Sequence, residues 1–133
     1  MSDELLATWR ADETTPGAAR RLVRSFLEGC GLHDLVEIAV LLTSEVVTNS
    51  LLHAPGDIGL RAARRDDMVR IEVYDRNPTP ARLVAQPDER GRGLQIVAAE
   101  ADGWGSEPLI GCKVTWFELR EHVAAPREEP VSR

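Results

Sequence analysis

The stretch Thr43-Ser-Glu-Val-Val-Thr-Asn-Ser-Leu-Leu-His-Ala-Pro55 carries one narrow polar stripe on an otherwise apolar helix. At about 100° per residue, Glu45 and Asn49 lie one turn apart on the same face, and His53 follows one turn later. The apolar positions of this helix are expected to be buried: Leu41, Leu42, Val46, Val47, Leu51 and Leu52. A carboxylate and an amide on a largely buried helix carry a desolvation penalty. The stripe is therefore either a ligand site or the solvated face of an ordinary amphipathic helix.

The composition is that of one soluble globular domain. The chain has 133 residues, of which 43% are hydrophobic and 29% charged, enough for a single two-layer core. The formal net charge of -6 argues against direct binding of nucleic acid, because phosphate binding needs a basic surface. No run approaches the roughly 20 apolar residues of a membrane span, and no signal peptide is visible. These features predict a cytoplasmic protein with no membrane association.

Periodicity and turn residues predict eight regular elements. In chain order they are a strand over 5–10, helices over about 15–29 and 34–52, strands over 58–63 and 68–74, a helix from Leu94, and strands over 104–107 and 113–120. Thr14-Thr15-Pro16 is typical of a helix start, and Gly29-Cys30-Gly31 of a helix end. The residues Arg64-Arg65-Asp66-Asp67 are expected to form the polar turn of a hairpin.

This order predicts an α+β fold, a two-layer sandwich with helices on one face of a mostly antiparallel, mixed sheet. It lacks the βαβ alternation of a dinucleotide-binding fold. Residues 75–90 contain three prolines and little periodicity, so they are expected to form a long functional or mobile connection. The domain is expected to span 1–121, and the charged residues 122–133 to be a disordered tail.

The cysteine and lysine content of the sequence indicates no catalytic or metal-binding role. Cys30 and Cys112 have no metal-binding spacing and are interpreted as reduced, structural thiols. Of the 16 basic residues only Lys113 is a lysine. We interpret this bias as a property of the coding sequence and expect no mechanistic role from it.

Three blocks, in order, resemble the anti-sigma factor serine kinases. These are small members of the superfamily of ATPases and kinases that includes gyrase and the histidine kinases. The blocks are Glu45-Val-Val-Thr-Asn49-Ser-Leu-Leu-His53-Ala54, the loop that begins at Asp75, and Glu89-Arg-Gly91-Arg-Gly93-Leu94. The ending Gly111-Cys-Lys-Val-Thr-Trp-Phe-Glu-Leu119 is similar to the last strand of that family. The resemblance implies the Bergerat fold, in which three helices cover one face of the sheet.

The resemblance also implies a site for ATP and Mg²⁺. Asn49 would place its side-chain oxygen on Mg²⁺, a hard ion that prefers oxygen ligands. Glu45 would accept the proton of an attacking serine hydroxyl, which is the carboxylate role in phosphoryl transfer. Asp75 would accept a hydrogen bond from the exocyclic amine of adenine. Without the other blocks, an aspartate in this position is instead interpreted as a turn former.

The glycine block would hold the phosphates. Gly91 and Gly93 would let the backbone approach them, and the helix that begins at Leu94 would add amide donors. Arg92 would contact the γ-phosphate, or it is simply solvated. Thr115, in the last strand, completes the nucleotide-binding set that the resemblance implies. Without the other blocks, the two glycines are also compatible with a plain loop-to-helix junction.

The implied function is that of an ATP-binding anti-sigma factor with protein serine/threonine kinase activity. Its partners would be a sigma factor, contacted through Arg20, and an anti-anti-sigma antagonist, which it would phosphorylate. The N-terminal strand and helix would form a homodimer surface. In one departure, Arg76-Asn77-Pro78-Thr79-Pro80 follows Asp75 where the superfamily has glycines.

The departure after Asp75 keeps an alternative open, a catalytically weak or inactive ATP-sensing interaction module. A third interpretation is the ATP-binding part of a histidine kinase. It requires a helical dimerisation segment with a phosphorylatable histidine, and His33, His53 and His122 do not supply that context.

Overall fold

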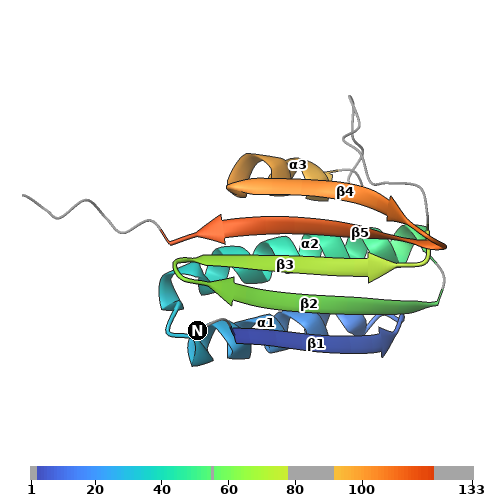
Figure 1. The fold of residues 1–133 in the computed structure, drawn as a ribbon. Coiled ribbons are helices and arrows are strands. Elements are labelled where there is room, and N and C mark those ends of the chain that lie inside the picture. Colours follow the sequence, from blue (N-terminus) through green and yellow to red (C-terminus); the bar gives the residue numbers. More distant parts are fainter. Residues whose placement is uncertain (1–2, 55, 78–91, 122–133) are drawn as a thin grey trace, which may run out of the picture.

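The computed structural model describes residues 3–54, 56–77 and 92–121, with five strands and three α-helices (Figure 1). In chain order the elements are β1 (Asp3–Arg10), α1 (Thr15–Gly29), a short 3-10 helix (His33–Leu35), α2 (Val36–His53), β2 (Asp57–Arg65), β3 (Met68–Asp75), α3 (Arg92–Glu100), β4 (Gly103–Leu109) and β5 (Cys112–Arg120). All eight expected elements are present, with shifted ends. The proposed tail, 122–133, and most of the long connection lie outside the described residues.

The strands form one sheet in the order β1-β2-β3-β5-β4, and the three helices cover one face of it (Figure 1). Every neighbouring pair among the described strands is antiparallel. The prediction of an α+β two-layer fold is confirmed. The expectation that the sheet is mixed is wrong, because the described strands pair only in antiparallel fashion. The chain crosses from β3 through α3 to the far edge and returns as β5 between β3 and β4, which makes β5 antiparallel to both.

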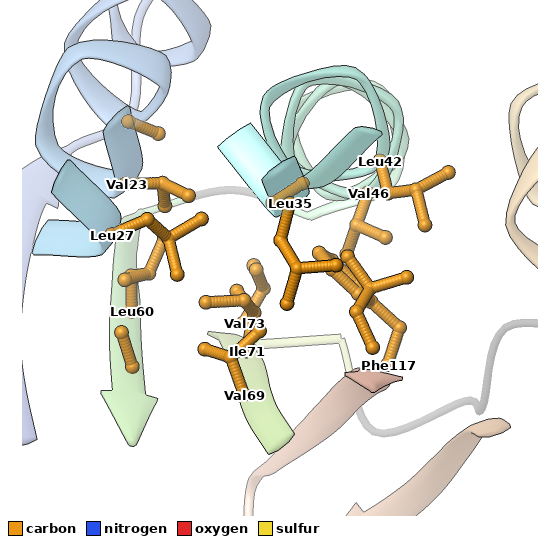
Figure 2. Close-up of a cluster of buried hydrophobic side chains, with 14 of the residues drawn as sticks. Val23, Leu27, Leu35, Leu42, Val46, Leu60, Val69, Ile71, Val73 and Phe117 are labelled. Atoms are coloured by element: carbon orange, nitrogen blue, oxygen red, sulfur yellow. The ribbon is translucent and has the colours of Figure 1, made fainter. Parts of the chain in front are cut away.

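The core lies between the sheet and the helices (Figure 2). Val69, Ile71 and Val73 alternate along β3 and are fully buried, as their spacing predicts. Phe117 of β5 is also fully buried, and Leu42 and Val46 of α2 belong to the same cluster. Burying each such side chain stabilises the fold by about 1.5–3 kcal/mol. Among the α2 positions expected to be buried, Leu41 and Leu52 are instead 42% and 50% exposed, because only part of the helix surface faces other elements.

Two element boundaries differ from the sequence-based expectation, and the second of them changes the site. The turn between β2 and β3 is shorter than the predicted four residues, because the strands pair as far as Arg65 and Met68. Asp66 takes the left-handed conformation there, at a φ of 55°. The helix α3 begins at Arg92 rather than Leu94, so Gly93 is a helical residue.

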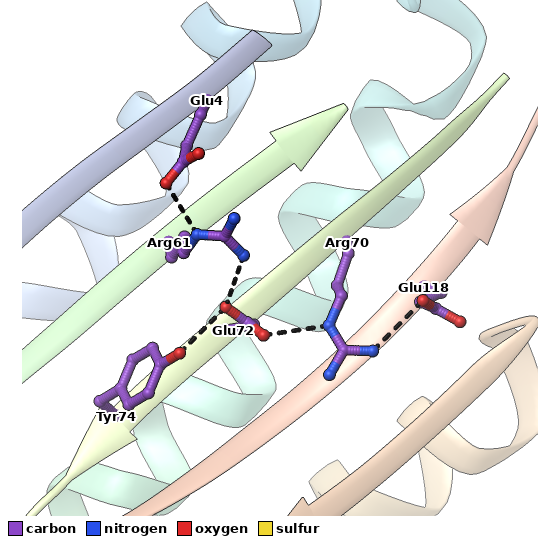
Figure 3. Close-up of polar contacts among 6 residues, drawn as sticks. All are labelled: Glu4, Arg61, Arg70, Glu72, Tyr74 and Glu118. Carbon is purple, nitrogen blue, oxygen red and sulfur yellow. Dashed lines mark hydrogen bonds and ion pairs between the residues drawn. The ribbon is translucent and has the colours of Figure 1, made fainter. Parts of the chain in front are cut away.

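The outer face of the sheet carries a row of paired charges (Figure 3). The row runs across four strands through Glu4, Arg61, Glu72, Arg70 and Glu118, with Tyr74 beside Glu72. Glu72 is 8% exposed and accepts hydrogen bonds from Arg61 Nη1, Arg70 Nε and the Tyr74 hydroxyl, each at 3.0 Å. Burial raises the pKa of Glu72, but these three hydrogen bonds outweigh it and leave the pKa below its ordinary value.

By length and composition alone, the segment His33–His53 could span a membrane, with a mean hydropathy of 1.6. In the fold it packs against α1, α3 and the sheet, and 44% of its most apolar window is buried. This packing is typical of a helix in the core of a folded domain. The cytoplasmic location stays a prediction.

Candidate functional site

The polar stripe of α2 faces the beginning of α3. A Cβ atom placed on Gly93 would lie 2.6 Å from Glu45 Oε2 and 3.4 Å from Glu45 Cβ. Gly93 is buried, and Glu45 is partly exposed. The fold therefore brings two of the expected site residues together, although they are 48 positions apart in the sequence (93 − 45). The absence of a side chain at Gly93 makes room for the Glu45 carboxylate.

Asn49 follows one turn after Glu45 and is also partly exposed. In the described part of the chain, neither side chain has a hydrogen-bond partner on another residue. A carboxylate and an amide oxygen on one helix face are thus available to a ligand. The stripe ends at His53, whose carbonyl accepts a hydrogen bond of 3.0 Å from Asn77 Nδ2. This bond ties the end of α2 to the residues that follow β3.

Asp75 ends β3 and is 2% exposed. Its Oδ1 accepts a hydrogen bond of 2.9 Å from the Asn77 backbone N–H, so the turn-forming role holds for one oxygen. Its Oδ2 lies 3.3 Å from Lys113 Nζ in an ion pair but accepts no hydrogen bond. Buried polar atoms without a hydrogen-bond partner among the described residues are Thr43 Oγ1, Ser50 Oγ, Trp116 Nε1 and Asp75 Oδ2. Asp75 supplies the only charged one.

The sequence interpretation missed Lys113. The only lysine in the chain is 2% exposed and lies directly opposite Asp75 in the register of β3 and β5. The signal was present in the sequence, because a single lysine among 16 basic residues is unusual. Its role could not be inferred before the strand pairing was known. The coding-bias interpretation therefore overlooked a buried ammonium that is paired with Asp75.

Thr115 and Arg20 have partners within the fold. Thr115 is buried two residues after Lys113, and its Oγ1 lies 3.1 Å from Ser106 Oγ of β4. Arg20 is exposed, and its Nη1 donates a hydrogen bond of 2.9 Å to Ser44 Oγ. The arginine that the resemblance assigns to a partner therefore also links α1 to α2.

The glycine block is only partly described. Gly91 lies outside the described residues, and of Arg92 only the backbone, at the start of α3, is described. The expected place of Gly93 in the loop is wrong, because Gly93 lies in the first turn of α3. Its role in holding the phosphates stays a prediction. Among the described residues, no group of three or more His, Cys, Asp or Glu side chains could hold a metal ion. Both cysteines are free thiols.

A groove of about 350 Å³ lies elsewhere, between β1 and α1. It is lined by Ala7, Trp9, Ala18, Arg21, Leu22 and Ser25. All of these lining residues belong to β1 and α1, and none to α2, β3 or β5, so the groove is separate from the α2 stripe and from Asp75. It coincides with the strand and helix for which the resemblance implies a homodimer surface.

Comparison with known proteins identifies the fold. A similar fold occurs in the crystal structure of the RsbU and RsbW domains of Rv1364c from Mycobacterium tuberculosis, with a TM-score of 0.69 and 22% sequence identity. The match covers 89% of this chain and 32% of that chain, so this chain spans about a third of its length. No protein-family profile and no curated protein matches. The resemblance drawn from the sequence is thus confirmed at the level of the fold.

Proposed function

We propose that this protein is an ATP-binding anti-sigma regulatory factor with protein serine/threonine kinase activity. In this proposal it sequesters a sigma factor and phosphorylates a serine or threonine of an anti-anti-sigma antagonist. The observation that carries the nucleotide-binding part of the proposal is Asp75 Oδ2, a buried carboxylate oxygen at the end of β3 that forms an ion pair with Lys113 but accepts no hydrogen bond. An exocyclic amine of a base is the kind of donor that such an oxygen lacks.

The α2 stripe supports the second half of the site. Asn49 offers an amide oxygen, which suits Mg²⁺, and magnesium usually takes the rest of its ligands from phosphates and water. The metal would neutralise phosphate charge. Glu45, one turn earlier and against the start of α3, is placed to accept the proton of a serine hydroxyl. The residues present therefore fit Mg·ATP, and the protein contributes mainly by positioning these groups.

Transfer of γ-labelled phosphate from Mg·ATP to a candidate antagonist tests the kinase. We expect transfer by the wild type and its loss in Glu45→Ala. Glu37→Ala is the matched control, because Glu37 lies on the same helix with its side chain 82% exposed and paired with Arg24. Absence of transfer by the wild type, or equal transfer by Glu45→Ala and Glu37→Ala, contradicts the kinase.

One observation favours the second candidate, an ATP-sensing module without catalysis. Asn77 stands where the superfamily has glycines, and hydrogen bonds from its backbone N–H and its side-chain Nδ2 tie the residues after β3 to Asp75 and to the end of α2. Such a tied segment limits how the region next to the base can adapt. This candidate predicts Mg·ATP-dependent partner binding that survives Glu45→Ala and is lost in Asn49→Ala. Calorimetry on the two variants distinguishes it from the kinase.

Partner contacts through Arg20 and a homodimer through β1 and α1 are further parts of the proposal. Arg20 is exposed and its hydrogen bond to Ser44 is on the surface, so its guanidinium remains accessible to a partner. The groove lined by Trp9 offers apolar surface for a second copy. Sedimentation of the wild type and of Trp9→Ala tests the dimer. A monomeric wild type contradicts it.

A further inference from the structure

The environment of Lys113 is unusual for a lysine. Its side chain is 2% exposed, and that of its partner Asp75 is fully buried. Lysine is almost never fully buried unless it is paired, and removing both charges from water carries a penalty that the ion pair only partly offsets. In the described part of the chain, Asp75 is its only ion-pair partner. The fold therefore keeps an ammonium in its interior at a position where an apolar residue would pack more simply.

The pair also has unused hydrogen-bonding capacity. An ammonium has three N–H donors, and the ion pair at 3.3 Å engages one side of it. Asp75 Oδ1 is taken by the Asn77 backbone, whereas Oδ2 accepts no hydrogen bond. Asp75 and Lys113 lie opposite each other on neighbouring strands and both belong to the buried face of the sheet. A donor and an acceptor are thus held side by side.

This arrangement matches one edge of adenine. The amine at C6 of adenine is a donor, and the adjacent ring nitrogen N1 is an acceptor. Guanine has a carbonyl at C6 and presents two neighbouring donors, N1–H and the amine at C2. In guanine the N1–H next to the amine would meet the Lys113 ammonium, which is itself a donor and cannot accept a hydrogen bond. Oδ2, which still has room to accept a hydrogen bond, and the Lys113 ammonium therefore favour adenine.

We propose that Lys113 is a specificity-determining residue that donates a hydrogen bond to N1 of adenine while Asp75 Oδ2 accepts from the amine. This inference rests on the proposed nucleotide site. Since both side chains are covered in this structure, the base has to uncover the pair as it binds. Exclusion of water then makes the loss of either contact expensive, because a buried donor or acceptor left without its hydrogen bond is strongly disfavoured.

Calorimetric titration of the wild type with the magnesium complexes of three nucleotides tests the inference. These are ATP, 1-deaza-ATP, which has a C–H in place of N1, and 7-deaza-ATP, a control that keeps the same edge. We expect 1-deaza-ATP to bind about 10- to 100-fold more weakly than ATP, the range of a hydrogen bond to a charged group. 7-deaza-ATP should bind like ATP. Equal binding of 1-deaza-ATP and ATP overturns the inference and leaves the nucleotide site standing.

Variants assign the contact to Lys113. In Lys113→Met the preference for ATP over 1-deaza-ATP should disappear, whatever the change in overall affinity. Persistence of the full preference in this variant overturns the inference. Because Lys113→Met leaves a buried carboxylate unpaired and can fail to fold, the same comparison is made in Lys113→Met combined with Asp75→Asn, which buries no charge. If the wild type binds none of the three nucleotides, the proposed function itself fails.

Discussion

The substitution Gly93→Ala tests the contact between α3 and the polar stripe of α2. The added methyl would lie 2.6 Å from Glu45 Oε2, a distance that real Cβ atoms essentially never show. The carboxylate is the end of a flexible side chain, so we expect it to move while both helices stay in place. Gly17→Ala in α1 is the matched control, because its methyl would meet only Arg21 Nη1 at 3.4 Å and Arg20 Nη2 at 3.5 Å.

The two variants should differ in stability. Replacing glycine by alanine inside a helix raises the free energy of unfolding by about 0.5–1 kcal/mol. We expect this gain for Gly17→Ala. In Gly93→Ala this gain is offset if the Glu45 side chain is pushed away from a staggered conformation, which costs about 0.5–1.5 kcal/mol. The free energy of unfolding of Gly93→Ala should therefore stay within about 0.5 kcal/mol of the wild type.

Urea unfolding measures these differences, and a double variant identifies their cause. In Glu45→Ala the methyl at position 93 no longer meets a carboxylate, so adding Gly93→Ala to that background should restore the full gain. If the proposed kinase is correct, Gly93→Ala should also lower phosphate transfer by about 10-fold or more, since small displacements of reacting groups reduce rates strongly. Equal stabilisation by Gly93→Ala in the wild type and in Glu45→Ala would refute the reasoning.

Three further predictions concern the sheet. Because the pKa of Glu72 is lowered in the folded state, its contribution to stability is present above the ordinary value of 4.5 and is lost as the pH falls through the folded pKa. Urea midpoints measured from pH 7 to pH 3 should therefore fall less steeply for Glu72→Gln than for the wild type. Phe117→Ala should lower the free energy of unfolding by about 3–5 kcal/mol, because it empties a fully buried site; a loss below about 1 kcal/mol in thermal or urea unfolding would contradict that. Gly105→Ala should lower it by about 1–3 kcal/mol, since the new methyl would lie 2.9 Å from the Trp116 ring. The near-ultraviolet circular dichroism should change with it, because Arg70 stacks on that ring at 4.0 Å.

Much of the fold followed from local patterns. The alternation of Val69, Ile71 and Val73 predicted both the strand and its buried face, because side chains in a strand point to opposite faces in turn. The helical repeat predicted α1 and α2 to within a few residues. The start of α3 was misplaced because a Gly-Arg-Gly sequence is typical of a loop. In the fold Gly93 lies against Glu45 of α2, a contact between distant residues that no local pattern records.

The candidate site was harder to predict than the fold, because it depends more on contacts between residues that are distant in the sequence. The sequence by itself determined the polar stripe on α2, the position of Asp75 at the end of a strand and the order of the elements. Tertiary structure alone decided that Lys113 lies opposite Asp75, that Glu45 lies against Gly93 and that Arg20 reaches Ser44. The physical reason is that periodicity reports which face of an element is buried, whereas strand register and helix packing decide which residues of distant elements meet.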